Sequence, residues 1–161
     1  HPTLIANDHP LSQVNGSFNA VYLHGHACKE MMLQGRGAGD LPTASAVVGD
    51  ILHAATVDVH VHPTFVNSAN ADASLVFTND WKTRYFLRLS IQDEPGSLAK
   101  IATWLSSEQV SIATMMQKAE LAGSRVPLII ITHEANEQAI RAALAKFDPE
   151  VCTVENMIRV E

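Results

Sequence analysis

The residues best suited to chemistry lie in two glycine-containing turns, each followed by a helix-like segment. The first turn is Gly35-Arg-Gly-Ala-Gly-Asp-Leu-Pro-Thr43. Glycine lets a backbone approach a ligand closely, and the N–H groups at a helix N-terminus favour an anion. The turn has neither the G-x-G-x-x-G spacing of a dinucleotide site nor the G-K-[ST] of a phosphate loop. Its spacing therefore leaves open either an anion contact or a structural tight turn.

The second turn, Asp93-Glu-Pro-Gly-Ser-Leu98, could bind a free amino acid. Pro95 suits a first helical turn, and Gly96 leaves room for a ligand against the backbone. The helix N–H groups could hold a carboxylate, while Asp93 could face an ammonium group. Asp93 could equally be a helix N-cap, with Gly96 only relieving crowding. Gln117 is a further candidate, because its amide can both donate and accept. The candidate effector residues are Asp93, Pro95, Gly96, Ser97, Leu98 and Gln117.

Two histidine pairs are the only pattern that suggests a metal. His24 and His26 flank one glycine, and His60 and His62 flank one valine. Zinc sites ordinarily need four ligands, and no Cys, Asp or Glu completes either pair at a recognisable spacing. We therefore predict no metal site.

Composition excludes several classes of protein. The 161 residues are 47% apolar, and 11 basic against 17 acidic side chains give a net charge of −6. This balance argues against a nucleic-acid partner, because phosphate contact needs clustered Lys and Arg. No apolar run approaches the ~20 residues of a membrane helix, so no membrane partner is expected. Cys28 and Cys152 form no disulfide framework, which favours a cytoplasmic location.

The elements that position the first turn can be predicted from residues 18–55. Residues 18–24 and 28–34 are strand-like and flank Gly25, which predicts an antiparallel hairpin. The glycine turn follows, with Pro42 in the first turn of a helix. An amphipathic helix is predicted by apolar residues at helical spacing, namely Ala44, Val47, Val48, Ile51, Leu52 and Ala55.

The second turn belongs to a clearer pattern over residues 83–161. Alternation of apolar residues from Tyr85 to Ile91 predicts a strand. Helical spacing predicts helices around residues 98–105 and 140–147, and further strands are predicted over 110–117, 126–132 and 151–160. The apolar run 126–132 favours a strand buried on both faces. The order βαββαβ predicts an α+β, ferredoxin-like domain with helices on one sheet face.

We divide the chain into residues 1–62, a connecting segment over 63–82, and residues 83–161. The first region is a mixed α/β fragment made of hairpin, glycine turn and helix. The connecting segment contains short polar and small residues without a sustained period.

The second region, with D-x-P-G-x-L in its first turn, resembles the ACT domain, a small-molecule-sensing module. The whole chain resembles the C-terminal part of homoserine dehydrogenase, the end of the catalytic domain plus an ACT domain. The string G-x-G-A-G-x-x-P-T-A-S-A-V over residues 35–47 is the most specific match. The other matching segments are residues 9–14, 19–21, 110–112, 132–134 and 158–161, together with Asp50 and Gln117.

This resemblance implies an NAD(P)-dependent oxidoreductase that interconverts homoserine and aspartate 4-semialdehyde, on the path to threonine, methionine and isoleucine. In that family the cofactor domain, the catalytic lysine and the homoserine-binding acids lie upstream. Lys29 and Lys82 match no catalytic motif, so no catalytic residue is carried over, and the chain alone is expected to be inactive and without bound cofactor. The glycine turn resembles the segment that touches the dinucleotide, which makes Gly37, Ala38, Gly39, Pro42 and Thr43 the candidate cofactor contacts.

The ACT resemblance implies allosteric regulation by an amino acid, threonine first among them, and a homodimer through residues 83–161. The alternative is a freestanding ACT-type module for amino-acid binding or dimerisation. The segment from Gly35 to Asp50 distinguishes the two, because a freestanding sensor has no use for a strand, glycine turn and helix of this type.

Overall fold

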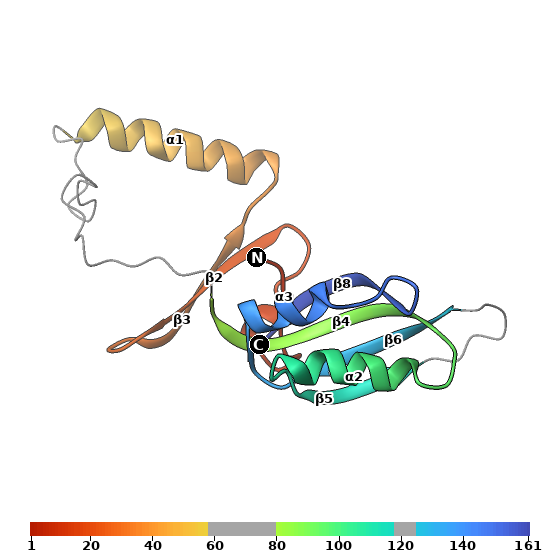
Figure 1. Ribbon diagram of the computed structural model, residues 1–161. Coiled ribbons are helices and arrows are strands. Elements are labelled where there is room, and N and C mark those ends of the chain that lie inside the picture. Colours follow the sequence, from red (N-terminus) through yellow and green to blue (C-terminus); the bar gives the residue numbers. More distant parts are fainter. Residues whose placement is uncertain (58–79, 118–124) are drawn as a thin grey trace. The chain divides into compact units, whose positions relative to one another are not determined.

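The computed structural model describes residues 1–57, 80–117 and 125–161, which belong to two compact units (Figure 1). One unit contains Ala6–Val76, and the other combines His1–Ile5 with Phe77–Glu161. The sequence division had placed the first five residues in the first region. The structure places them with the second because Thr3 and Leu4 pair with its last strand. Most of the predicted connection over 63–82 lies outside the described residues.

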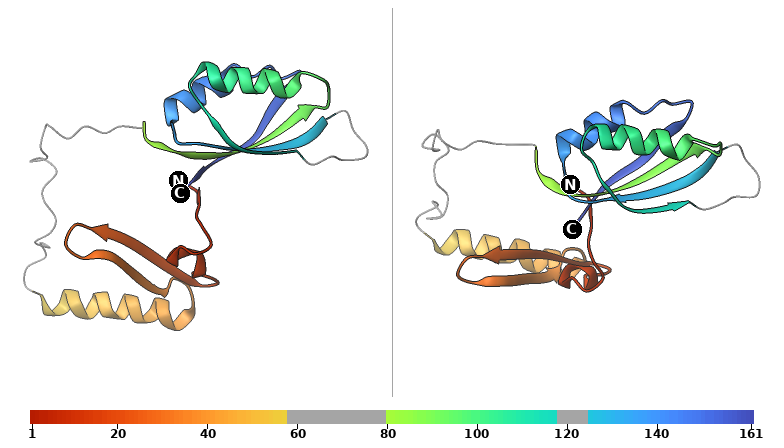
Figure 2. Two further views of the ribbon diagram at one scale, coloured as in Figure 1. Left: turned by 90° about the horizontal axis from the view of Figure 1, so that it is seen from below. Right: turned by 60° about the horizontal axis from the view of Figure 1, so that its bottom comes forward.

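The C-terminal unit is the α+β domain that the βαββαβ pattern predicts. Its sheet has the order β1-β8-β4-β6-β5, and β7 pairs with the start of β4. Both helices cover one face of this sheet (Figure 2). The elements are β1 (Thr3–Leu4), β4 (Lys82–Gln92), α2 (Ser97–Ser107), β5 (Ile112–Gln117), β6 (Arg125–Thr132), β7 (Ala135–Asn136), α3 (Glu137–Ala145) and β8 (Cys152–Val160).

The core of this unit lies between the sheet and the two helices. Alternate residues of β4, from Tyr85 to Ile91, are fully buried and confirm the predicted alternation. On β6 the buried residues are Val126, Leu128, Ile130 and Thr132, while the residues between them are only partly buried. The prediction that β6 is buried on both faces was therefore wrong. A run of apolar residues cannot show whether anything covers the second face.

That second face carries an apolar patch in the middle of the sheet. Phe86 of β4 lies opposite Ile131 of β6 and Ile158 of β8, and all three are partly buried. Beside them Arg88 forms an ion pair with Glu155 at 2.8 Å. The pairing of β4 with β8 is irregular between Arg88 and Leu89, which divides this ladder into two halves.

The N-terminal unit follows the predicted order of hairpin, glycine turn and helix. It comprises η1 (Pro10–Gln13), β2 (Phe18–Gly25), β3 (Lys29–Arg36) and α1 (Asp40–Thr56). The helix starts four residues before its first predicted apolar position, because the glycine turn itself caps it. Apolar residues of α1, such as Val48 and Ile51, are exposed, and none of the described residues in this unit is buried. Within its described part, this unit therefore has no core of its own. No helix in the described ranges is long and apolar enough to cross a membrane.

Candidate functional site

The glycine turn depends on Gly37 for packing. Its N–H donates to the carbonyl of Ser17 at 2.8 Å, which ties the end of β3 to the residue preceding β2. A Cβ at Gly37 would collide with the side-chain amide of Asn19. A side chain at Gly37 would thus force the exposed Asn19 side chain to move.

Gly39 and its neighbours border a shallow hollow at the N-terminus of α1. Gly39 has a φ of 126°, a conformation that favours glycine, and its carbonyl accepts from the N–H of Thr43 at 3.0 Å. The hollow has a volume of about 500 Å³. It is lined by Arg36, Ala38, Gly39, Asp40, Leu41 and Pro42. Three of the five predicted cofactor residues thus meet there, whereas Gly37 and Thr43 do not line it.

The charge in this hollow is mixed. The Arg36 guanidinium lies 4.8 Å from the ring centroid of Phe18, and its Nη1 donates to Ser17 Oγ at 3.0 Å. Asp40, in the first turn of α1, also lines the hollow. The N–H groups of a helix start suit an anionic group, and Arg36 supports that preference while Asp40 opposes it. The residues present fit contact with one edge of a dinucleotide.

The turn between β4 and α2 requires glycine because of its backbone conformation. Gly96 is the N-cap of α2 with a φ of 97°, and a Cβ there would meet open space. The crowding alternative for Gly96 is therefore wrong. A larger residue at this position would strain the left-handed backbone instead of filling the turn. Ser97, the first residue of α2, is buried, and its N–H donates to the carbonyl of Glu94 at 3.2 Å.

Asp93 does not cap the helix, so the N-cap alternative is also wrong. No side chain makes a capping hydrogen bond at the start of α2. Instead, the Asp93 Oδ1 accepts from Nε2 of Gln117 at 3.3 Å. Two residues that the sequence analysis selected separately, from the end of β4 and the end of β5, are thus brought together, and both are exposed.

A second hollow lies on another side of the same turn. It has a volume of about 330 Å³ and is lined by Gln92, Glu94, Pro95, Ser97, Lys100, Asp148, Glu150 and Val151. Pro95 and Ser97 belong to it, whereas Asp93, Gly96, Leu98 and Gln117 do not. Three carboxylates against one lysine make this hollow unsuitable for a carboxylate ligand. The side of the turn that carries Asp93 and Gln117 is the better candidate.

Sequence analysis missed a buried carboxylate at the start of α3. Glu137 is 3% exposed and accepts hydrogen bonds from Tyr85 Oη at 2.8 Å, Arg159 Nε at 3.1 Å and Arg141 Nε at 2.9 Å. Burial opposes its charge, but the hydrogen bonds from Tyr85 and Arg141 and the nearby Arg159 charge hold the pKa of Glu137 below its ordinary value. Burial first, and then the hydrogen bond to Glu137, raise the pKa of Tyr85 to about 12.

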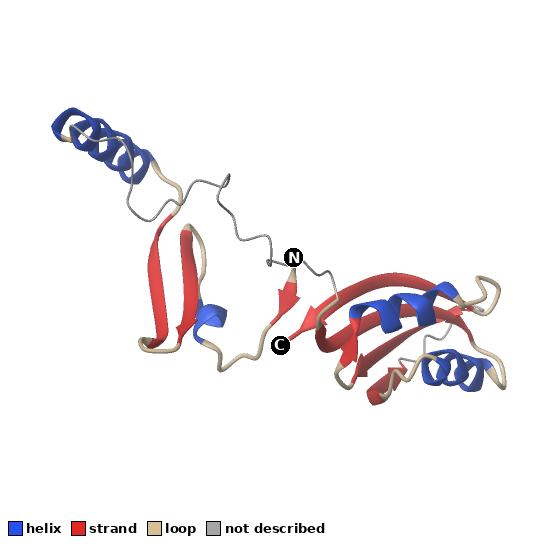
Figure 3. Cartoon of the chain, turned by 60° about the vertical axis from the view of Figure 1, so that its left-hand side comes forward, coloured by secondary structure: helices blue, strands red, loops and turns tan. Residues whose placement is uncertain are grey.

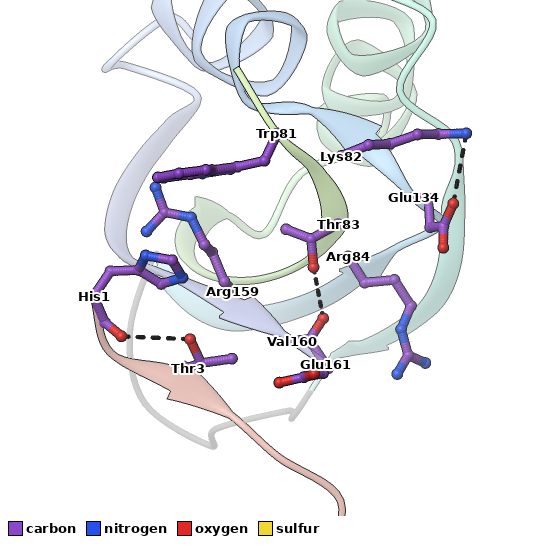
Figure 4. A pocket seen from close by; sticks show the side chains of 10 residues that line it. All are labelled: His1, Thr3, Trp81, Lys82, Thr83, Arg84, Glu134, Arg159, Val160 and Glu161. Atoms are coloured by element: carbon purple, nitrogen blue, oxygen red, sulfur yellow. Dashed lines mark hydrogen bonds and ion pairs between the residues drawn. The ribbon is translucent and has the colours of Figure 1, made fainter. Parts of the chain in front are cut away.

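The same cluster borders a hollow of about 540 Å³ between β1, the start of β4 and the end of β8 (Figure 4). The Arg159 guanidinium lies 5.3 Å from the ring centroid of Trp81, and the His1 ring lies 5.4 Å from the same ring. Lys82 and Glu134 form an exposed ion pair at 3.5 Å on its rim. A glutamate in a polar stretch gave no sequence signal for this arrangement.

Within the described ranges, no group of three or more His, Cys, Asp or Glu could hold a metal ion. His24 is the residue before last in β2, and His26 lies in the hairpin turn. His60 and His62 lie outside the described residues.

Comparison with known proteins identifies both units. Residues 1–52 match the homoserine dehydrogenase family, and residues 85–148 match the ACT domain. The homoserine dehydrogenase of Corynebacterium glutamicum is 37% identical over the whole chain, which covers 36% of that protein. The Pseudomonas aeruginosa homoserine dehydrogenase is 39% identical over 92% of the chain and is likewise covered to 36%.

A solved structure gives the same result. The homoserine dehydrogenase of Thiobacillus denitrificans is 35% identical over the whole chain with a TM-score of 0.75, and the chain covers 38% of it. The fold thus defines an ACT-domain protein of the α+β class. The chain corresponds to the C-terminal segment of homoserine dehydrogenases, which are oxidoreductases, and it spans between a third and two fifths of its relatives' length.

Proposed function

We propose that this chain is the regulatory part of an enzyme that interconverts homoserine and aspartate 4-semialdehyde with NAD(P). The observation that carries the proposal is the joint match of residues 1–52 to homoserine dehydrogenase and of residues 85–148 to an ACT domain. The first match disfavours a freestanding sensor, because such a module needs no glycine turn and helix α1. The chain contributes effector binding, and the reaction requires the remainder of the enzyme.

The proposed effector is threonine, bound on the side of the turn that carries Asp93 and Gln117. The N–H of Ser97 is bound by Glu94, but those of Leu98 and Ala99 have no partner within the helix and can receive a carboxylate. Asp93 can receive the ammonium group, and the Gln117 amide can bind either polar end. In this structure the Gln117 amide donates to Asp93. Both side chains are exposed, so an incoming ammonium group displaces only one weakly held hydrogen bond.

A homodimer is proposed to form through the C-terminal unit. Strand β5 is one edge of the sheet, and Met115 and Met116 on it are exposed. An uncovered edge offers unpaired backbone groups to another strand. The opposite edge, β8, is partly covered by β1. Gln117 lies at the end of β5, so a dimer through this edge would bring the effector turn to the subunit interface.

The proposed cofactor contact is the hollow at the start of α1. Gly39, Ala38 and Pro42 would present backbone to one edge of the dinucleotide, while Gly37 and Thr43 would support that loop. When bound, the NAD(P) supplies the hydride chemistry, and this loop would only help to position it.

Calorimetric titration with threonine tests the effector proposal. The chain is titrated alongside Asp93→Asn and the matched neighbour Glu94→Gln, which removes an acid from the other side of the turn. Loss of a charge-assisted hydrogen bond should weaken binding by about tenfold or more in Asp93→Asn, while Glu94→Gln should bind like the parent chain. If no aspartate-family amino acid binds at millimolar concentration, the effector proposal is wrong.

A further inference from the structure

Strand β1 is a two-residue edge strand that belongs to a different unit from the chain that follows it. Thr3 pairs with Arg159 and Leu4 with Val160, both in parallel register (Figure 3). The N–H of Glu161 donates to the carbonyl of Leu4 at 3.0 Å. The next residue but one, Ala6, already belongs to the N-terminal unit. This short strand is therefore where the chain passes from the ACT sheet to the glycine-turn unit.

The end of β8, which pairs with β1, is held in place by two side chains. Glu137, buried under the sheet end, binds Arg159 through two nitrogens, with Nη2 at 2.9 Å. The hydroxyl of Thr83 donates to the carbonyl of Val160 at 2.9 Å. The last residues of β8 thus present a fixed backbone edge, which lowers the entropy cost of docking a strand.

The strand itself is held only weakly. Leu4 is exposed, Thr3 is only partly buried, and neither belongs to the hydrophobic core. A strand held by a few backbone hydrogen bonds, with little apolar burial, lies at the low-stability end of a structure and opens locally. Docked and released β1 are therefore two discrete states that a modest free-energy change can shift.

Strand β4 connects this edge to the effector turn. Near its start, Arg84 pairs with Val160, and near its end Ile91 pairs with Cys152. The effector turn begins directly after Gln92. The irregular pairing between Arg88 and Leu89 separates the half of the β4–β8 ladder beside the turn from the half beside β1. Strand β4 itself runs without a break from the docking edge to the turn, so a change at the turn can reach that edge along this strand.

From β1 the chain enters the glycine-turn unit through an ordered turn. The N–H of His9 donates to the carbonyl of Ala6 at 3.1 Å, and the Ser12 hydroxyl donates to the carbonyl of Asn7 at 2.7 Å. Soon afterwards the carbonyl of Ser17 binds the N–H of Gly37. Release of β1 therefore frees the start of the segment that holds the glycine turn.

We propose that Thr3–Leu4 is a releasable strap, and that effector binding to the ACT unit increases the fraction of it docked on β8. This inference rests on the proposed effector site. Its two-state element is the β1–β8 pairing. Thermodynamic linkage is reciprocal. If effector binding favours the docked strap, then loss of docking must lower the affinity for the effector.

A matched pair of proline variants tests the strap. Leu4 directs its carbonyl toward β8, so the backbone groups of Thr3 point to the free side of the edge. Leu4→Pro should therefore break docking, whereas Thr3→Pro removes an N–H that faces solvent and is tolerated at an edge. Neither residue is in the core, so the ACT unit should stay folded in both, which near-ultraviolet circular dichroism checks.

Two readouts are taken on the whole chain. Exchange of the Glu161 amide with deuterium should accelerate by about tenfold or more in Leu4→Pro and stay unchanged in Thr3→Pro. Threonine should slow this exchange in the parent chain, and its affinity should fall by about fivefold or more in Leu4→Pro only.

Two results would overturn the strap. One is rapid exchange of Glu161 in the parent chain, which would mean that β1 is not docked. The other is threonine binding of equal strength in both proline variants with no effect on Glu161 exchange. Failure of any amino acid to bind would refute the effector proposal instead and, with it, the effector's control of the strap. Hydrogen exchange at the Glu161 amide would then be the remaining test of whether β1 docks on β8.

Discussion

Replacement of Glu137 by glutamine should destabilise the C-terminal unit strongly although it changes only one atom. The amide presents a nitrogen either where Oε2 now accepts from Tyr85 and Arg159 or where Oε1 accepts from Arg141. Breaking one partner of a fully buried ion pair costs about 3–5 kcal/mol. Arg141 is 63% exposed and contributes little, but Arg159 is only 17% exposed. We therefore expect a loss of about 2–4 kcal/mol in the free energy of unfolding.

The matched control is Glu134→Gln, which makes the same chemical change. Glu134 pairs with Lys82 at 3.5 Å, and the two side chains are 66% and 64% exposed. An exposed pair of this kind contributes about 0–1 kcal/mol. Urea unfolding at pH 7, followed by far-ultraviolet circular dichroism, compares the two variants. A difference in unfolding free energy below about 0.5 kcal/mol between the two variants would refute the claim that the charge of Glu137 stabilises the fold.

The pH dependence of this difference provides a second check. The folded pKa of Glu137 lies below its ordinary value of 4.5. Its stabilising contribution is thus present above pH 4.5 and is lost as the pH falls through the folded pKa. The gap between Glu137→Gln and Glu134→Gln should close over that acidic range. A gap that stayed constant down to pH 2 would show that packing, and not charge, causes the loss.

Two further predictions concern groups that burial keeps neutral. Tyr85 has a pKa raised to about 12 from 10.0, so the unfolded chain releases this proton first and stability should fall on the order of 2–3 kcal/mol between pH 10 and 12. Tyr85→Phe should remove that part of the alkaline loss in urea titrations, and an unchanged alkaline limb would contradict the assignment. Burial raises the pKa of the Cys152 thiol to about 11, whereas Cys28 is exposed. At pH 8 a maleimide should therefore add once to the native chain and twice in urea, as read by mass spectrometry; double addition to the native chain would show that Cys152 is accessible.

The C-terminal domain was predictable because its signals are local. The alternation from Tyr85 to Ile91 and the helical spacing around residues 98–105 each occur within one element, and the structure confirms both. The Asp93 interpretation was less secure, because an acid before a helix looks like an N-cap whether it caps or not. Only the three-dimensional arrangement shows that Asp93 faces Gln117, 24 residues away.

Two features lay beyond sequence reasoning for physical reasons. Glu137 stands in a polar stretch at the start of α3, and its burial depends on Tyr85 of β4 and Arg159 of β8. Strand β1 has only two residues, too few for any period, and its partner lies at the far end of the chain. For the same reason, no sequence pattern shows that Thr3 and Leu4 pair with the last strand.

The exposure of α1 and the β2–β3 hairpin has a consequence for how this chain melts. Heat capacity and denaturant sensitivity both scale with the surface that unfolding newly exposes. The described part of the N-terminal unit has no buried residue to expose. The heat-capacity change on unfolding then comes mainly from the C-terminal unit. We expect about 1 kcal/mol/K, and not the roughly 2 kcal/mol/K of 161 cooperatively folded residues. By this measure, the described part of the glycine-turn unit adds little to the heat capacity of unfolding.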